Sequence, residues 1–162
     1  MKTTKRLNIA YGSNLNLEQM ARRCPTAKIY GKGILKGYRL LFQGSPGNAY
    51  ATIEPYKGGE VPVLVWELQP EDEQSLDRYE GFPHFYYKDD LKVELESGET
   101  VTAMVYIMTD KIKDRIHLNL PSQRYLNIVA AGYKSAGFDT DIIEAAFKVS
   151  EDAVKKKAPG II

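Results

Sequence analysis

Two short segments of the chain hold the residue types best suited to chemistry. In the first, Tyr11-Gly12-Ser13-Asn14 follows a short apolar stretch and precedes a helical pattern. Glycine permits positive φ values and can turn backbone N–H groups outward, and the start of a following helix adds positive potential. Such a turn could bind a ligand carboxylate, or an oxygen that becomes negative during acyl transfer. The competing interpretation is a plain turn in which Ser13 and Asn14 act as caps.

The second segment centres on Glu80, which we predict to end a helix beside several aromatic residues. The negative end of the helix dipole and apolar surroundings both disfavour the ionised carboxylate, so both raise its pKa. A carboxyl group that titrates near neutrality can accept a proton and then return it. An exposed glutamate at a helix end is the competing interpretation. Tyr86, Tyr87 and Tyr106 are expected mostly in the core, where a hydroxyl could still orient a polar substrate.

Other common chemistries are poorly matched by the sequence. The glycine-rich motifs of nucleotide-binding proteins are absent. One cysteine and two distant histidines, His84 and His117, do not indicate a zinc site. Ser13 lies between a predicted strand and helix, as a nucleophile elbow would, but the G-x-S-x-G pattern is missing. Either histidine could act as its base only through a tertiary contact that the sequence does not predict.

Strand patterns dominate the first two thirds of the chain, and helical patterns close it. Strands are predicted at 7–11, in two stretches within 27–43, and at 48–54, 61–68, 85–95 and 99–108, the last two joined by a hairpin turn at Ser97-Gly98. Helices are predicted from a cap at Asn14 or Asn16 to about Arg22, with Asn16 placing Gln19 at a capping-box spacing, from Pro70 to Gly81, and over 122–133 and 139–148. Because strands and helices do not alternate regularly, we predict an α+β domain with a curled sheet or small barrel.

The segment 61–68 has a pattern typical of a buried strand. Its residues are mostly apolar at both odd and even positions, which indicates a central strand covered on both faces. Pro62 has no N–H to donate, so we expect it near the start of this strand.

Bulk properties indicate an ordinary single domain spanning residues 1–162. The length fits one domain of roughly 100 to 200 residues. The net charge of +1 gives no electrostatic case for binding nucleic acid or an acidic membrane. The lysines at 155–157 are interpreted as a solvated tail.

The same properties bear on location and assembly. Cys24 is the single cysteine, so no intrachain disulfide can form, which fits a reducing compartment. The first residues lack the apolar core of a signal peptide, and no apolar run approaches the ~18 residues of a membrane span. We therefore predict a cytoplasmic protein. The sequence leaves a monomer and a dimer equally open.

Six segments form a recognisable pattern: 9–15, 51–55, 63–68, 76–81, 103–106 and 121–126. Their order resembles the γ-glutamylcyclotransferase-like (AIG2-like) family over about residues 7–138. The most specific part is the pairing of Tyr11-Gly12-Ser13-Asn14 with the downstream Leu76-Asp77-Arg78-Tyr79-Glu80-Gly81. The resemblance implies a small mixed β-barrel with flanking helices.

The resemblance also implies a reaction on a small-molecule substrate. The substrate's own α-amine attacks its γ-carbonyl, which releases 5-oxoproline and a free amine, with binding geometry supplying much of the catalysis. Glu80 would be the general acid/base, and no metal or organic cofactor is implied. Residues 11–14 would hold the glutamyl group, and Tyr87 and Tyr106 would line the pocket. The alternative is a binding module that keeps the pocket without the chemistry.

The substrate within this class stays open. The loop reads Gly-Ser-Asn-Leu, unlike the Gly-Ser-Leu of the glutathione-specific branch, so glutathione is not favoured. γ-Glutamyl amino acids, γ-glutamyl-lysine isopeptides and γ-glutamylated antibiotic precursors all remain candidates.

Overall fold

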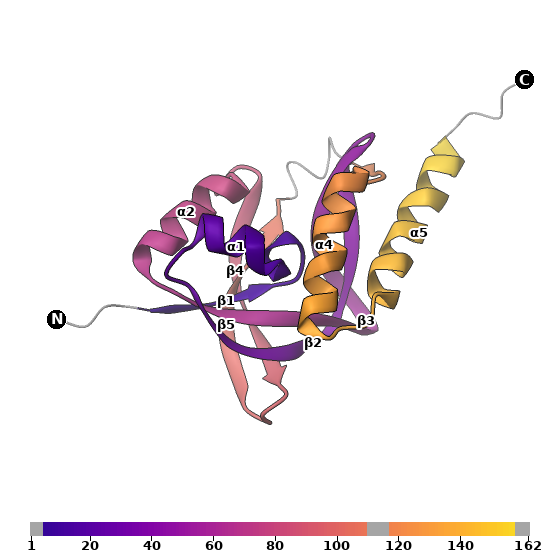
Figure 1. The fold of residues 1–162 in the computed structure, drawn as a ribbon. Helices are drawn as coiled ribbons and strands as arrows, with labels where there is room; N and C mark the ends of the chain where they lie inside the picture. Colours follow the sequence, from indigo (N-terminus) through magenta and orange to yellow (C-terminus); the bar gives the residue numbers. More distant parts are fainter. Residues whose placement is uncertain (1–4, 110–116, 158–162) are drawn as a thin grey trace, which may run out of the picture.

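The computed structural model describes residues 5–109 and 117–157 (Figure 1). Its strands are β1 (Arg6–Ala10), β2 (Lys28–Ser45), β3 (Asn48–Leu68), β4 (Tyr86–Leu95), β5 (Thr100–Met108) and β6 (His117–Leu118). Its helices are the short 3-10 turn η1 (Ser13–Leu15), then α1 (Leu17–Arg23), α2 (Pro70–Glu80), α4 (Gln123–Ala136) and α5 (Asp141–Lys157).

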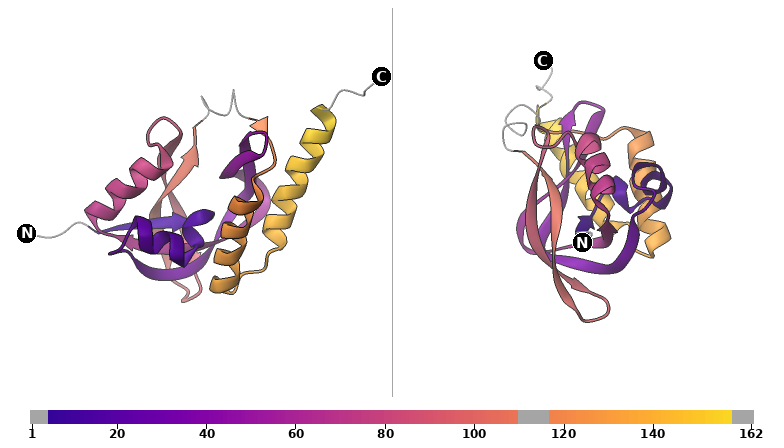
Figure 2. Two further views of the ribbon diagram at one scale, coloured as in Figure 1. Left: turned by 45° about the horizontal axis from the view of Figure 1, so that its top comes forward. Right: turned by 90° about the vertical axis from the view of Figure 1, so that its left-hand side faces the viewer.

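Strands β1 to β5 close into a barrel. The strand order is β3-β1-β5-β4-β2, and pairing of β2 with β3 completes the circle, while β6 adds to β2. Strand β1 runs parallel to β5, and the other pairs are antiparallel, so the barrel is mixed. In Figures 1 and 2, α1 and α2 lie toward one side of the barrel and α5 toward the other, with α4 between them. The predicted α+β fold, a small mixed β-barrel with flanking helices, is confirmed.

The prediction of four separate strands within 27–68 is wrong. β2 and β3 form one long hairpin that pairs from Lys28 opposite Glu67 to Ser45 opposite Asn48. A register shift follows Lys36, where Gly37 adopts a φ of 84°. The glycine-rich stretches that suggest strand ends are therefore irregularities within a continuous ladder, as is common where barrels bend.

Pro62 lies inside β3, opposite Ile34, and not near the start of a strand as predicted. Strand β1 pairs with β3 only as far as Leu64, so Pro62 has a strand neighbour on one side only. A missing N–H is tolerated at such a position. The predicted burial of the 61–68 segment is confirmed, since Val61, Val63 and Val65 are fully buried.

Local signals in the sequence place the start of α1 and both ends of α2 correctly. The Asn16 side chain caps α1 by accepting a hydrogen bond from the Gln19 N–H at 2.9 Å. Pro70 opens α2, and Gly81, with a φ of 65°, adopts the left-handed conformation that ends it. The predicted hairpin is confirmed as β4 and β5.

Helix α5 is longer than predicted. It continues to Lys157, so the lysines at 155–157 belong to its last turn and not to a tail. Positive charge is favourable there because the C-terminal end of a helix carries partial negative charge. Among the helices that the structure describes, none combines the length and apolar character needed to cross a membrane.

Helix α4 packs directly on η1. A Cβ atom at Gly132 would lie 2.7 Å from the Leu15 carbonyl carbon and 2.8 Å from the Asn16 nitrogen. The Asn16 side chain also donates to the Ile128 carbonyl at 3.0 Å. The close approach therefore needs glycine at position 132 and fixes the turn at residues 13–15 against α4.

We predict that Gly132→Ala destabilises the protein by about 2 kcal/mol, because overpacking against backbone outweighs the gain in helix propensity. Urea unfolding measures the effect. The matched control is Ala131→Gly at the neighbouring exposed position, where only propensity changes and a loss of about 1 kcal/mol is expected. A stabilised Gly132→Ala variant would contradict this packing.

Candidate active site

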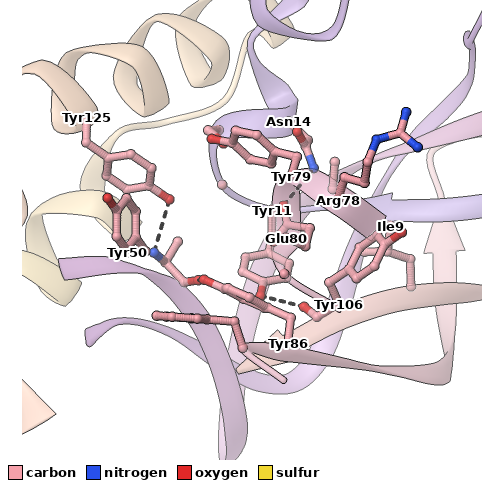
Figure 3. Close-up of a pocket in the computed structure, with 16 residues that line it drawn as sticks. Ile9, Tyr11, Asn14, Tyr50, Arg78, Tyr79, Glu80, Tyr86, Tyr106 and Tyr125 are labelled. Carbon is pink, nitrogen blue, oxygen red and sulfur yellow. Dashed lines mark hydrogen bonds between the residues drawn. The ribbon is translucent and has the colours of Figure 1, made fainter. Parts of the chain in front are cut away.

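A cavity of about 340 Å³ opens between the turn after β1, the end of α2 and the barrel wall (Figure 3). Segments far apart in the sequence line it: Ile9, Ala10, Tyr11, Gly12, Ser13, Asn14, Tyr50, Ala51, Arg78, Tyr79, Glu80, Gly81, Phe85, Tyr86, Tyr106 and Tyr125.

The turn at residues 11–14 enters the cavity because β1 is held between β3 and β5. Ile9 pairs with Val65 on one side and Val105 on the other, so the chain leaves the sheet directly into the cavity wall. Gly12 has a φ of −125°, so the expected positive φ is wrong. Glycine is favoured at position 12 because there is little room for a side chain: a Cβ atom there would lie 3.0 Å from the Ala51 Cβ.

Glu80 is the last residue of α2, and its side chain lies at this cavity. Its carboxyl Oε1 is 3.5 Å from the Asn14 side-chain nitrogen, a contact drawn in Figure 3. Burial raises the pKa of Glu80 to about 7, while the Arg23 charge and the Asn14 hydrogen bond act in the opposite direction. The predicted rise in pKa is confirmed, with loss of solvation as its main cause.

Three tyrosine hydroxyls at the cavity already act as hydrogen-bond donors to other groups of the protein. Tyr11 donates to the Tyr106 carbonyl at 2.7 Å, and Tyr86 donates to the Ala51 carbonyl at 2.7 Å. Tyr106 donates to the Asp77 carboxylate at 2.5 Å. A phenolic hydroxyl has one proton, so each of these oxygens offers a ligand only its remaining acceptor capacity. Burial raises the pKa of all three tyrosines, which keeps them protonated.

Tyr125 has the opposite arrangement. Its hydroxyl accepts a hydrogen bond from the Ala51 N–H at 3.0 Å, which leaves the hydroxyl proton directed elsewhere. Tyr50 stacks edge-on against it with ring centroids 5.1 Å apart. The cavity thus combines acceptor groups near Glu80 with a potential donor on α4.

The predicted site residues fall into two groups. Glu80, residues 11–14 and Tyr106 all line the cavity. Tyr87 is not among the residues that line it, and its side chain is 39% exposed. Successive strand residues face opposite sides of a sheet, so the neighbouring Tyr86 takes the position at the cavity.

Sequence reasoning missed Tyr50 and Tyr125 as site residues. Tyr125 lies one helical turn before the buried Val129 on α4, so its spacing was a usable signal. Tyr50 lies in β3 next to residues that the pattern assigns to the core, and no local feature marks it.

Ser13 is not arranged as a serine-hydrolase nucleophile. Its hydroxyl lies 3.1 Å from an Arg23 nitrogen and 3.4 Å from the Tyr79 hydroxyl. No histidine lines the cavity among the residues whose side chains the structure describes. In the same described ranges, no group of three or more His, Cys, Asp or Glu residues is placed to hold a metal ion.

Known proteins match the chain in sequence and in fold. The family model described as "Gamma-glutamyl cyclotransferase, AIG2-like" matches residues 9–127. Human γ-glutamylcyclotransferase is 31% identical over 146 residues, covering 85% of this chain and 75% of the human protein. The bovine protein of the same name is 31% identical over 139 residues, covering 81% of this chain and 71% of that protein.

A solved structure described as γ-glutamyl cyclotransferase superposes with a TM-score of 0.74 at 26% identity, covering 94% of this chain and 99% of the other. This structural match agrees with the barrel and its flanking helices. The chain therefore belongs to the AIG2-like γ-glutamyl cyclotransferase family and is an enzyme of the γ-glutamylcyclotransferase type.

Proposed function

We propose that the enzyme cleaves a small γ-glutamyl amide or γ-glutamyl amino acid by cyclisation, releasing 5-oxoproline and a free amine. The observation that carries this proposal is the meeting of Glu80 and residues 11–14 at one cavity. The relatives named γ-glutamylcyclotransferase support the same chemistry. It would be classed as a transferase or lyase, and the single cysteine supports a cytoplasmic location.

The polarity of the cavity supports one orientation of the substrate. The α-ammonium group carries only donors, so it suits the acceptor side formed by Glu80 and the hydroxyls of Tyr11, Tyr86 and Tyr106. The glutamyl α-carboxylate carries only acceptors, so it suits the backbone N–H groups of residues 12–14. This arrangement assigns substrate-binding roles to Tyr11, Gly12, Ser13, Asn14 and Tyr106.

In the proposed reaction, ionised Glu80 takes a proton from the substrate's α-ammonium group. The neutral amine attacks the γ-carbonyl carbon, and a new C–N bond closes the five-membered ring. Protonated Glu80 then gives the proton to the leaving nitrogen as the original amide C–N bond breaks. Glu80 next accepts the second proton of the ring nitrogen and passes it to the released amine, so 5-oxoproline is neutral at its ring nitrogen, the amine leaves as an ammonium ion and Glu80 is ionised again. A pKa of about 7 suits these transfers at neutral pH.

A binding module without turnover is the second candidate function. It would keep the same cavity and ligand contacts but would show no product. The presence of a poorly solvated carboxyl at position 80 favours the enzyme, because a binding site for a cation gains from a fully ionised acid and not from a raised pKa.

We predict that Glu80→Gln lowers kcat/KM by at least about 10²-fold, because an amide cannot shuttle a proton. The assay measures 5-oxoproline released from γ-glutamyl-alanine, γ-glutamyl-lysine isopeptide and γ-glutamylamines. Glu71→Gln is the matched control, since Glu71 lies exposed in the first turn of the same helix. Full activity in folded Glu80→Gln would remove the proposed role. Ligand binding without product in the unsubstituted protein would favour the binding module.

We also predict that Glu80→Gln stabilises the fold at pH 8. The folded pKa of about 7 lies above the ordinary value of 4.5, so the contribution of Glu80 to stability is present below pH 4.5 and is lost as the pH rises through 7. The variant should gain about 1–3 kcal/mol over the unsubstituted protein at pH 8, and the difference should shrink toward pH 4.5. Urea unfolding at both pH values tests this. A gain that does not change with pH would show that the carboxyl is well solvated.

A further inference from the structure

Arg23, in the last turn of α1, contacts the site without lining the cavity. One terminal nitrogen of its guanidinium donates to the Asn14 side-chain oxygen at 2.6 Å and to the Ser13 hydroxyl at 3.1 Å. The other donates to Gln19 at 2.9 Å and to the Tyr79 hydroxyl at 2.7 Å. Arg23 thus joins the turn after β1 to α2, the two segments that carry the proposed chemistry.

These contacts fix the orientation of the Asn14 side chain. A guanidinium carries only donors, so the Asn14 atom that faces Arg23 must be the amide oxygen. The amide nitrogen then faces the other way, toward the Glu80 carboxyl at 3.5 Å. Without Arg23 the amide could turn over and present its oxygen to Glu80, where it would repel a carboxylate.

The charge of Arg23 is not neutralised by a direct ion pair. Within residues 5–109 and 117–157, no carboxylate lies within 4 Å of its guanidinium, and all four of its hydrogen-bond partners are neutral. The neighbouring Arg22, by contrast, pairs with Glu18 at the surface at 2.9 Å. An arginine that only linked α1 to the neighbouring segments would gain more from a carboxylate partner.

On the basis of the proposed function, we propose that Arg23 is a positioning residue for Glu80, holding the Asn14 amide with its nitrogen toward the carboxyl group. The neutral amide stands between the two charges. A direct ion pair commonly lowers the pKa of a carboxyl group by 1–3 units, which would leave Glu80 too weak a base at neutral pH. The intervening amide gives a weaker attraction that still favours the ionised form.

The other titratable groups around Glu80 do not supply this charge. Tyr11, Tyr86, Tyr106 and Tyr125 interact with it electrostatically from the turn, β4, β5 and α4, and Tyr79 precedes it on α2. Tyrosines are neutral at pH 7. One turn earlier on α2, Asp77 is ion-paired with Lys88 at 3.0 Å. Arg78, two residues before Glu80 on α2, also lines the cavity, but the positive charge that acts on the Glu80 carboxyl within the described residues is that of Arg23.

The test measures the Glu80 carboxyl directly, by ¹³C NMR titration of protein labelled at glutamate side chains, with Glu80→Gln identifying the signal. In Arg23→Met the Glu80 pKa should rise by about 0.5–1.5 units, and the acid limb of the kcat/KM profile should move by the same amount. Arg23→Lys keeps the positive charge, so the Glu80 pKa should lie close to its value in the unsubstituted protein. The kcat of Arg23→Lys should still be about 10-fold below that of the unsubstituted protein, because an ammonium group cannot bind four acceptors in fixed geometry.

Arg22→Met is the matched control and should leave the Glu80 pKa within about 0.2 unit, since exposed charges are well screened. Circular dichroism checks folding, and Arg23→Gln replaces Arg23→Met if the latter does not fold. An unchanged Glu80 pKa in folded Arg23→Met, or in folded Arg23→Gln where that variant replaces it, would overturn the proposal. If the unsubstituted protein releases no 5-oxoproline from any substrate, the proposed function fails, yet the titration still decides whether Arg23 positions Glu80.

Discussion

The carboxyl group of Glu80 occupies a place where ionisation is unfavourable, and the chemistry proposed for this protein depends on that constraint. Burial raises its pKa to about 7, and only the Asn14 amide and the Arg23 charge act against the rise. In open solvent the group would titrate near its ordinary value of 4.5, and in a direct ion pair lower still. In neither case would it hold and release a proton readily at neutral pH.

The barrel explains how such a group can face a turn that lies almost 70 residues earlier in the sequence. Strand β1 is fixed on both sides, by β3 and by β5, so the turn that follows it has little freedom. Helix α4 covers the turn from one side through the close approach at Gly132, and Arg23 holds it from another. The site is therefore set by rigid elements before any ligand binds, which is the condition for electrostatic preorganisation.

Much of this arrangement could be predicted from the sequence, where the signals were local. The Asn16 cap and the Gly81 stop mark helix ends through their own chemistry, and both were placed correctly. Features that depend on tertiary neighbours were not predicted correctly. Pro62 is tolerated inside β3 because β1 has already ended beside it, and Gly12 is required by the nearness of another strand rather than by its φ. The burial of Glu80 was predicted from its aromatic neighbours in sequence, whereas the contribution of Tyr50 from β3 required the fold.

The proposed mechanism requires one glutamyl group to span the cavity from the turn at residues 11–14 to the carboxyl group of Glu80. The most direct measurement is a crystal structure of Glu80→Gln with γ-glutamyl-alanine bound. We expect the substrate's α-nitrogen within about 3.2 Å of the side chain at position 80, and its α-carboxylate against the backbone N–H groups of residues 12–14. A γ-glutamyl group bound outside this cavity, or bound in the reverse direction with its α-amine away from position 80, would rule out the proposed mechanism.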